Sequence, residues 1–140
     1  MRSTAVEAAV RQSLDEAGLC SAGQTILCAL SGGPDSVALV SALAGLGRAR
    51  GFVVVAAHLD HGLREGSAAD AAFCATLCER LGITLGRGTA DVMGRGRRER
   101  GGLEQSARRE RYAFLRKVKA EVGAAAIAVA HTRDDQAETV

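Results

Sequence analysis

Three uninterrupted apolar runs restrict the folds that are open to this chain. Thr25–Leu30 (TILCAL), Phe52–His58 (FVVVAAH) and Ala126–Ala130 (AIAVA) carry almost no polar side chain between their ends. A strand with one face in water alternates apolar and polar residues, whereas a continuous apolar run is typical of a strand buried on both faces. Strands of that kind occur in parallel sheets that helices cover on each side. We therefore predict an α/β fold with a parallel sheet as its central layer.

Helical periodicity fills the intervals between these runs. Apolar residues recur at the helical spacing over four segments, which we predict to be helices: 3–18, 35–48, 65–81 and 103–122. A short further strand is predicted at Ile83–Leu85, and Thr132 is predicted to begin a last helix that runs to Val140. We divide the chain into an N-terminal helix at 1–22 and one domain at 23–140. Because Val140 falls about two turns into the predicted last helix, we expect the chain to be a fragment of a longer protein.

Composition and charge narrow the class of protein. The 140 residues are 47% hydrophobic, which is enough for the core of one domain. They contain no apolar run long enough to span a membrane and no apolar signal core near the N-terminus, so we predict a cytoplasmic protein without a membrane partner. Residues 80–119 hold 12 of the 18 Lys and Arg residues but only 4 of the 16 Asp and Glu residues. This basic segment favours a polyanionic partner, and a solvated basic surface is the alternative.

The cysteines are predicted to be reduced and buried. Cys20, Cys28, Cys74 and Cys78 contain no C-x-x-C pair. Cys74 and Cys78 lie four residues apart, on one face of a predicted helix, but have no close His or Cys companion in the sequence. Packing in the core is the favoured interpretation, with metal binding or redox chemistry as the alternative.

Each apolar run is followed by a polar cluster. SGGPDS (31–36) follows the first run, LDHGLR (59–64) follows the second, and HTRDDQAET (131–139) follows the third. The carboxyl ends of parallel strands meet at one edge of the sheet, where ligands bind in open α/β folds. The three clusters together therefore predict a binding site at that edge.

The first cluster has the features of a phosphate-binding loop. Gly32 and Gly33 let backbone N–H groups approach phosphate oxygens without a Cβ in the way, and the following helix adds its positive end. Pro34 suits the first turn of that helix, and Ser31 and Ser36 supply hydroxyl donors. Asp35 would repel a phosphate unless a divalent cation lies between them, so the loop itself indicates Mg²⁺. An ordinary glycine-rich turn is the alternative.

The lysine of the common nucleotide loop is missing. The sequence does not fit G-x-x-x-x-G-K-[ST], which disfavours ordinary hydrolysis of a γ-phosphate. S-G-G-x-D-S after a buried strand instead resembles the pyrophosphatase loop of the N-type ATP pyrophosphatases. In that superfamily the loop holds the β- and γ-phosphates, which leave together when the α-phosphate is attacked. No lysine for the γ-phosphate is then needed.

Three further stretches narrow the resemblance. AHLDHGLR (57–64), GLEQSARRERYAFL (102–115) and AHTRDDQAETV (130–140) are similar, in order and spacing, to the N-terminal catalytic domain of the tRNA(Ile)-lysidine synthetase family. The resemblance covers about Ile26 to Val140. It implies the three-layer adenine nucleotide alpha hydrolase-like fold, cut short at its C-terminal end, since the later tRNA-binding regions of that family are absent.

The family resemblance also implies an activity. Enzymes of this family join free L-lysine to C2 of the wobble cytidine in tRNA(Ile) with a CAU anticodon. They use ATP and Mg²⁺, pass through an adenylated base, and release AMP and pyrophosphate. Without the later tRNA-binding regions, we expect this chain to bind ATP but not to turn over. A homodimer stays open as a further partner.

Site residues follow from the resemblance position by position. It implies ATP binding by Ser31, Gly32, Gly33, Pro34, Asp35, Ser36 and His58. It implies catalytic roles for Asp35, Arg108, Asp135 and Glu138, with Mg²⁺ held by Asp35 and Asp135. Arg111 and Tyr112 belong to the same A-R-x-x-R-Y helix segment as Arg108. Structural roles remain the alternatives: a hydrogen-bonded histidine at a strand end, acids that cap a helix, and a solvated basic helix.

Two other functions stay open. One is an adenylating enzyme of the tRNA-thiolase type, which would need a sulfur-carrying cysteine near the ATP. The 2-thiocytidine synthetases share the loop but usually have Lys where this chain has Pro34, and they carry C-x-x-C motifs that are missing here. The other is a non-catalytic ATP-binding fragment.

Overall fold

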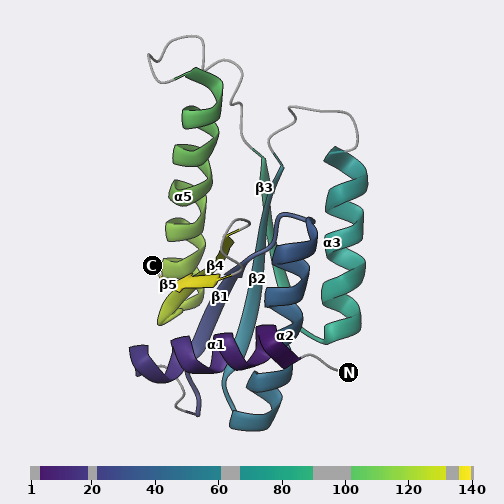
Figure 1. The fold of residues 1–140 in the computed structure, drawn as a ribbon. Helices are drawn as coiled ribbons and strands as arrows, with labels where there is room; N and C mark the ends of the chain where they lie inside the picture. The colour runs from purple at the N-terminus through teal and green to yellow at the C-terminus, as the bar shows by residue number, and fades with distance from the viewer. Residues whose placement is uncertain (1–3, 19–21, 61–66, 90–101, 132–135, 140) are drawn as a thin grey trace.

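A five-stranded sheet forms the centre of the molecule (Figure 1). The computed structural model describes residues 4–18, 22–60, 67–89, 102–131 and 136–139. The strands lie in the order β3-β2-β1-β4-β5. They are β1 (Thr25–Ala29), β2 (Val53–Asp60), β3 (Thr84–Thr89), β4 (Ala126–His131) and β5 (Gln136–Thr139). β1 pairs in parallel with β2 and β4, and β2 pairs in parallel with β3, which confirms the predicted parallel sheet.

Helices cover both faces of the sheet. The structure contains α1 (Thr4–Ala17), α2 (Pro34–Arg50), α3 (Ser67–Leu81) and α5 (Gly102–Val122). α2 and α3 pack on one face and α5 packs on the other, while α1 crosses in front of the lower half of α2 and contacts it (Figure 1). The predicted three-layer architecture is therefore confirmed.

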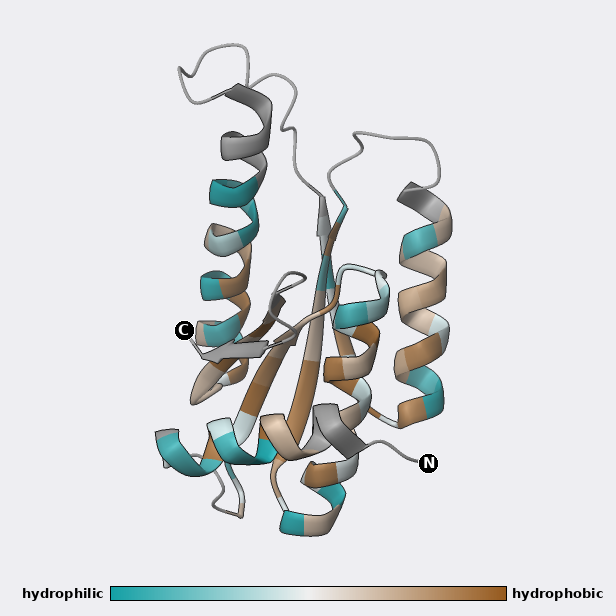
Figure 2. Cartoon of the chain, viewed as in Figure 1, coloured by the Kyte–Doolittle hydropathy of each residue, from teal (hydrophilic) through white to brown (hydrophobic). Residues whose placement is uncertain are grey.

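The sheet divides the core into two clusters. Ile26, Cys28 and Leu30 belong to the cluster under α2 and α3, whereas Leu27 and Ala29 belong to the cluster under α5. Successive residues of a strand point to opposite faces, so both faces of β1 must be apolar. The continuous apolar runs of the sequence have this origin, and they appear as brown strands between helices with teal outer faces in Figure 2.

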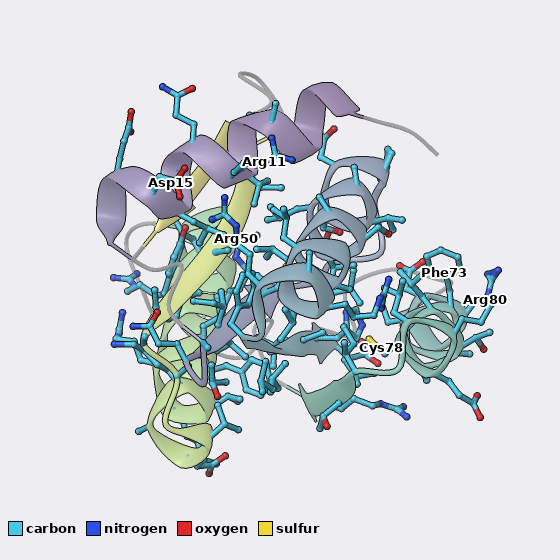
Figure 3. The ribbon with its side chains drawn as sticks, turned by 90° about the horizontal axis from the view of Figure 1, so that it is seen from below. Arg11, Asp15, Arg50, Phe73, Cys78 and Arg80 are labelled. Atoms are coloured by element: carbon cyan, nitrogen blue, oxygen red, sulfur yellow. The ribbon has the colours of Figure 1, made fainter. Side chains whose placement is uncertain are left out.

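α1 is tied to the rest of the molecule by apolar and ionic contacts. Val10 and Leu14 are buried in the cluster on the α2 side. Arg50 Nη1 at the end of α2 lies 3.0 Å from Asp15 Oδ1 (Figure 3). Among the described residues, no helix is long and apolar enough to cross a membrane.

The last predicted helix is wrong where the structure can test it. Gln136–Thr139 forms β5, which pairs antiparallel with β4 in the register Val129↔Glu138. Four residues make too few hydrogen bonds to hold a helix on their own, whereas pairing satisfies the open edge of β4. Residues 132–135, with Asp135, and the Gly/Arg-rich loop at 90–101 lie outside the described residues.

The third strand is longer than predicted. β3 covers Thr84–Thr89, whereas the sequence predicted only Ile83–Leu85. The second half of this strand could not be predicted from the sequence, because Gly86 and Gly88 carry no side chain with a strand preference. The strand is instead stabilised by its pairing with β2 and by α5, which packs closely over the two glycines.

Candidate functional site

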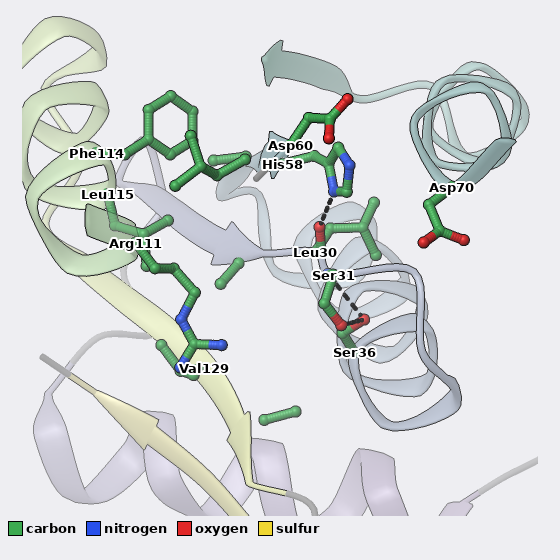
Figure 4. Close-up of a pocket in the computed structure, with 14 residues that line it drawn as sticks. Leu30, Ser31, Ser36, His58, Asp60, Asp70, Arg111, Phe114, Leu115 and Val129 are labelled. Carbon is green, nitrogen blue, oxygen red and sulfur yellow. Dashed lines mark hydrogen bonds between the residues drawn. The ribbon is translucent and has the colours of Figure 1, made fainter. Parts of the chain in front are cut away.

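A pocket of about 300 Å³ opens where β1, β2 and β4 end (Figure 4). Its walls come from these three strands, from the loop after β1, and from α3 and α5. The sequence predicted a site at this edge from the polar clusters that follow the apolar runs. The pocket confirms that the loop after β1 and the end of β2 lie side by side.

The loop after β1 is anchored to the sheet and then turns sharply. Leu30 N still donates a hydrogen bond of 2.8 Å to Ala57 O, beyond the last residue of β1. Gly32 then takes a φ of +100°, a conformation that side chains with a Cβ rarely adopt. Gly33 is extended and caps α2, and Pro34 occupies the first turn of that helix.

Two serine hydroxyls organise the backbone of the loop. Ser36 Oγ accepts hydrogen bonds from Ser31 N at 3.1 Å and from Gly32 N at 3.3 Å, and it donates one to Gly33 O at 3.1 Å. Ser31 Oγ accepts a bond of 3.3 Å from Gly33 N. Three consecutive N–H groups therefore converge on one small region at the N-terminus of α2. All three N–H groups are bonded to these hydroxyls here, so an anion that binds at this helix N-terminus would replace the hydroxyl oxygens as their acceptor.

His58 is buried beside the loop with one ring nitrogen engaged. Its Nδ1 lies 2.8 Å from Leu30 O, and its side chain lines the pocket (Figure 4). A carbonyl oxygen only accepts, so Nδ1 carries the proton. In the neutral ring Nε2 is then a hydrogen-bond acceptor. Cys74 Sγ lies 3.7 Å from Nδ1 on the side of α3.

Arg111 reaches the pocket from α5, whereas Arg108 does not. Arg111 is half-buried and lines the pocket, and its Nε is a buried donor with no hydrogen-bond partner among the described residues. Arg108 is exposed and does not belong to the lining. Both arginines contact the Tyr112 ring: the guanidinium carbon of Arg111 lies 5.3 Å from the ring centre, and that of Arg108 lies 5.1 Å from it. The helical phase therefore places Arg111 at the site.

The carboxylates of the lining differ from those that the sequence singled out. Asp60 and Asp70 line the pocket, whereas Asp35 is half-buried in the first turn of α2, outside the lining. Sequence reasoning missed Asp70 because an acid in the first turn of a helix is common. The side chains of Asp135 and Glu138 lie outside the described residues. In the described part of the chain, no group of three metal-ligating side chains is assembled.

The cysteines near the loop are buried thiols. Cys28, Cys74 and Cys78 are free, and each exposes 2% of its surface or less. Burial raises the pKa of Cys74 from 9.0 to about 11, and it raises the pKa values of Cys28 and Cys78 as well. These three thiols therefore stay protonated at neutral pH, and their burial confirms the prediction that they pack in the core.

A largely parallel sheet, whose central strand β1 leads through a glycine-containing loop into the N-terminus of α2, defines the class of open α/β proteins in which ligands bind at the carboxyl ends of the strands. A family model for the PP-loop domain matches residues 3–140. The chain belongs to the PP-loop domain family.

Curated relatives resemble this chain over nearly its whole length. It is 46% identical over 132 residues to a tRNA(Ile)-lysidine synthase of Dehalococcoides mccartyi and 44% identical over 137 residues to one of Symbiobacterium thermophilum. Each match covers 94% of this chain. A synthase of the same name from Thermobifida fusca is 42% identical over 135 residues. The chain spans only 28%, 27% and 40% of the length of these three relatives, respectively.

Two solved structures share the fold. A U34-tRNA thiolase from Methanococcus maripaludis matches with a TM-score of 0.76 at 16% identity, over 89% of this chain and 43% of the thiolase. An NH3-dependent NAD synthetase from Campylobacter jejuni matches with a TM-score of 0.59 at 20% identity, over 91% of this chain and 55% of the synthetase. At these identities the likeness concerns the fold alone.

Proposed function

We propose that this chain is the ATP-binding part of a tRNA(Ile)-lysidine synthase. The observation that carries the proposal is the loop at 31–36, which gathers three N–H donors, bonded here to serine hydroxyls, at the N-terminus of α2 and has no lysine for a γ-phosphate. The names of the curated relatives support the same function. The substrates would be ATP, free L-lysine and a tRNA(Ile) with a CAU anticodon.

The reaction needs two displacements, and the substrates supply both nucleophiles. The C2 oxygen of the cytidine attacks the α-phosphorus of ATP, the bond to the bridging oxygen breaks, and pyrophosphate leaves with the electron pair. The lysine amine then attacks C2, and AMP leaves with the former C2 oxygen. The amine loses a proton to solvent or to a nearby base. The task of the protein is to position the reactants and to stabilise charge.

The described residues suit the first displacement. The N–H groups of Ser31, Gly32 and Gly33 would hold the departing pyrophosphate at the positive end of α2. Arg111, with its unpartnered Nε, would neutralise charge that develops on the phosphates. His58 would accept a hydrogen bond through Nε2 from the nucleoside. Asp135 and Glu138 keep the catalytic roles proposed from the sequence, whereas the charge-neutralising role that was predicted for Arg108 passes to Arg111, because Arg108 is exposed and lies outside the pocket lining.

A magnesium ion fits this arrangement without a protein cage. Mg²⁺ is usually bound by one or two carboxylates together with substrate phosphates, and the rest of its shell is water. Asp35 beside the loop, with Asp135, is the proposed carboxylate set. When bound, the metal would neutralise the phosphates that Asp35 otherwise repels.

Magnesium dependence gives a direct prediction for Asp35. Calorimetric titration with ATP should show tighter binding with Mg²⁺ than with EDTA. Asp35→Asn should weaken Mg-ATP binding about tenfold, equivalent to about 1.4 kcal/mol, and should narrow the difference between the two conditions. Asp15→Asn on α1 is the control and should change neither. Equal affinity for ATP with Mg²⁺ and with EDTA would exclude the metal role.

The buried thiols disfavour a sulfur-transfer reaction. A thiolase-type enzyme needs a cysteine that ionises and reaches the adenylated substrate. Cys74 lies beside the loop, since a Cβ added at Gly32 would be 3.8 Å from its Sγ, but it is buried with a pKa of about 11. Cys20 lies outside the described residues.

A chimera tests the proposed function. This chain would replace the matching 132 residues of the Dehalococcoides mccartyi synthase, and lysine incorporation into tRNA(Ile) would be measured by mass spectrometry of the anticodon loop. We expect the chimera to form lysidine. A chimera that folds and binds ATP but forms no lysidine would refute the proposal and would favour the non-catalytic alternative.

A further inference from the structure

The pocket has a polar end and an apolar end. Ser31, Ser36 and His58 form the polar end, at the phosphate loop. Phe114 and Leu115 from α5 form the apolar end with Val129 from β4, and Phe114 lies across the pocket from the loop in Figure 4. A ligand with charged phosphates at one end and a flat apolar group at the other matches this division.

Phe114 is placed differently from the other phenylalanines. The chain contains three: Phe52 is buried in the core, Phe73 is exposed on the outer face of α3 (Figure 3), and Phe114 is half-buried in the pocket wall. Among the pocket-lining residues that the structure describes, Phe114 supplies the one phenyl ring.

A glycine in β3 makes room for this ring. A Cβ added at Gly88 would lie 2.7 Å from Phe114 Cε1, a separation that real Cβ atoms essentially never show, and 3.1 Å from Cδ1. Gly86 faces the same side of β3, but a Cβ there would lie 3.6 Å from Val118 Cγ1, an ordinary contact. The ring therefore packs directly on the backbone of β3 at Gly88, and any side chain at this position would displace it.

We propose that Phe114, seated on Gly88, is the residue that contacts the base of the nucleotide whose phosphates lie on the loop. Nucleobases stack on aromatic rings, and such contacts do not depend on the identity of the base. Arg111 lines the same wall from α5, and its positive charge disfavours the ammonium group of lysine beside it, whereas the two carboxylates of the lining, Asp60 and Asp70, come from β2 and α3. The inference rests on the proposed binding of ATP by the loop.

The test compares ATP with tripolyphosphate, which has the phosphates but no base. Both would be titrated by calorimetry, with Mg²⁺, into the wild-type chain and into Phe114→Leu, which keeps an apolar side chain but removes the ring. We expect Phe114→Leu to weaken ATP binding about tenfold and to leave tripolyphosphate binding unchanged. Phe73→Leu is the matched control on α3 and should bind both ligands as the wild type does.

A glycine pair provides a second, independent comparison. Gly88→Ala should weaken ATP binding without affecting tripolyphosphate, because the new Cβ displaces the ring, whereas Gly86→Ala should bind both normally. Unchanged tripolyphosphate binding also shows that each variant is folded. Equal losses for both ligands in Phe114→Leu, or no loss for ATP, would overturn the role of Phe114. A wild-type chain that binds neither ligand would instead refute the phosphate loop, and the inference with it.

Discussion

Replacing Arg111 by methionine should weaken tripolyphosphate binding about 10- to 100-fold, since hydrogen bonds to charged groups contribute about 1.5–3 kcal/mol. The same substitution should leave the free energy of unfolding unchanged or raise it. The buried Nε of Arg111 has no hydrogen-bond partner among the described residues, so in the free protein it has lost water without a replacement. A methionine reaches only as far as the position of Nε, so it removes the unpaired donor and keeps the packing of the aliphatic part of the side chain.

Arg108→Met is the matched control for this prediction. Arg108 contacts the same Tyr112 ring but is exposed and lies outside the pocket lining. Its loss should change tripolyphosphate affinity less than about threefold, as expected for an exposed charge. Calorimetry measures the affinities, and denaturant titration measures the stabilities. A larger loss of affinity in Arg108→Met than in Arg111→Met would contradict this prediction and would show that Arg108 is the residue that binds the phosphates.

The second large effect is a loss of stability in alkaline solution. The folded-state pKa of Cys74 is about 11, above the ordinary value of 9.0, because burial disfavours the thiolate. The protonated thiol therefore stabilises the fold fully below pH 9, and this contribution is lost as the pH rises through 11. Each such thiol should lower the free energy of unfolding by about 1.4 kcal/mol per pH unit in this range. Cys28 and Cys78, whose pKa values are also raised, should add to the slope.

Denaturant titrations at pH 8, 9, 10 and 11 would measure this loss. The slope of the wild type is compared with that of Cys74→Ala, so that the contributions of all other groups cancel. The variant is expected to be less stable at pH 8, because a buried sulfur is removed, but to lose stability more slowly with pH. Identical slopes in the two proteins would show that Cys74 ionises in the fold as freely as in the unfolded chain.

The sheet and its loop could be predicted from sequence because their signals are local. A continuous apolar run makes both faces of a strand apolar, which indicates a strand buried in a parallel sheet. The stretch SGGPDS (31–36) combines two glycines with the start of a helix, which indicates the loop. The family resemblance depended on the same short stretches. The prediction that the site lies at the carboxyl ends of the strands needed only the rule that parallel strands end at one edge.

Features that depend on packing could not be predicted in the same way. β5 forms because β4 offers an open edge, and no local pattern in Gln136–Thr139 indicates this. The sequence offers no ground for choosing between Arg108 and Arg111 as the residue that reaches the site. The orientation of α5 on the sheet decides it, because only Arg111 lines the pocket. Asp70 and Phe114 look like ordinary helix residues until α3 and α5 are placed beside the loop.

The central position of β1 also determines when the pocket can form during folding. The pairing partners Ile26 and Ala126 are 100 residues apart in the chain, so closing that loop has a large entropic cost before any contact repays it. The wall that β4 contributes is therefore missing until this long-range pairing is made. A nucleotide that needs the complete pocket would bind only the finished fold, so it should slow unfolding while leaving the rate of refolding unchanged.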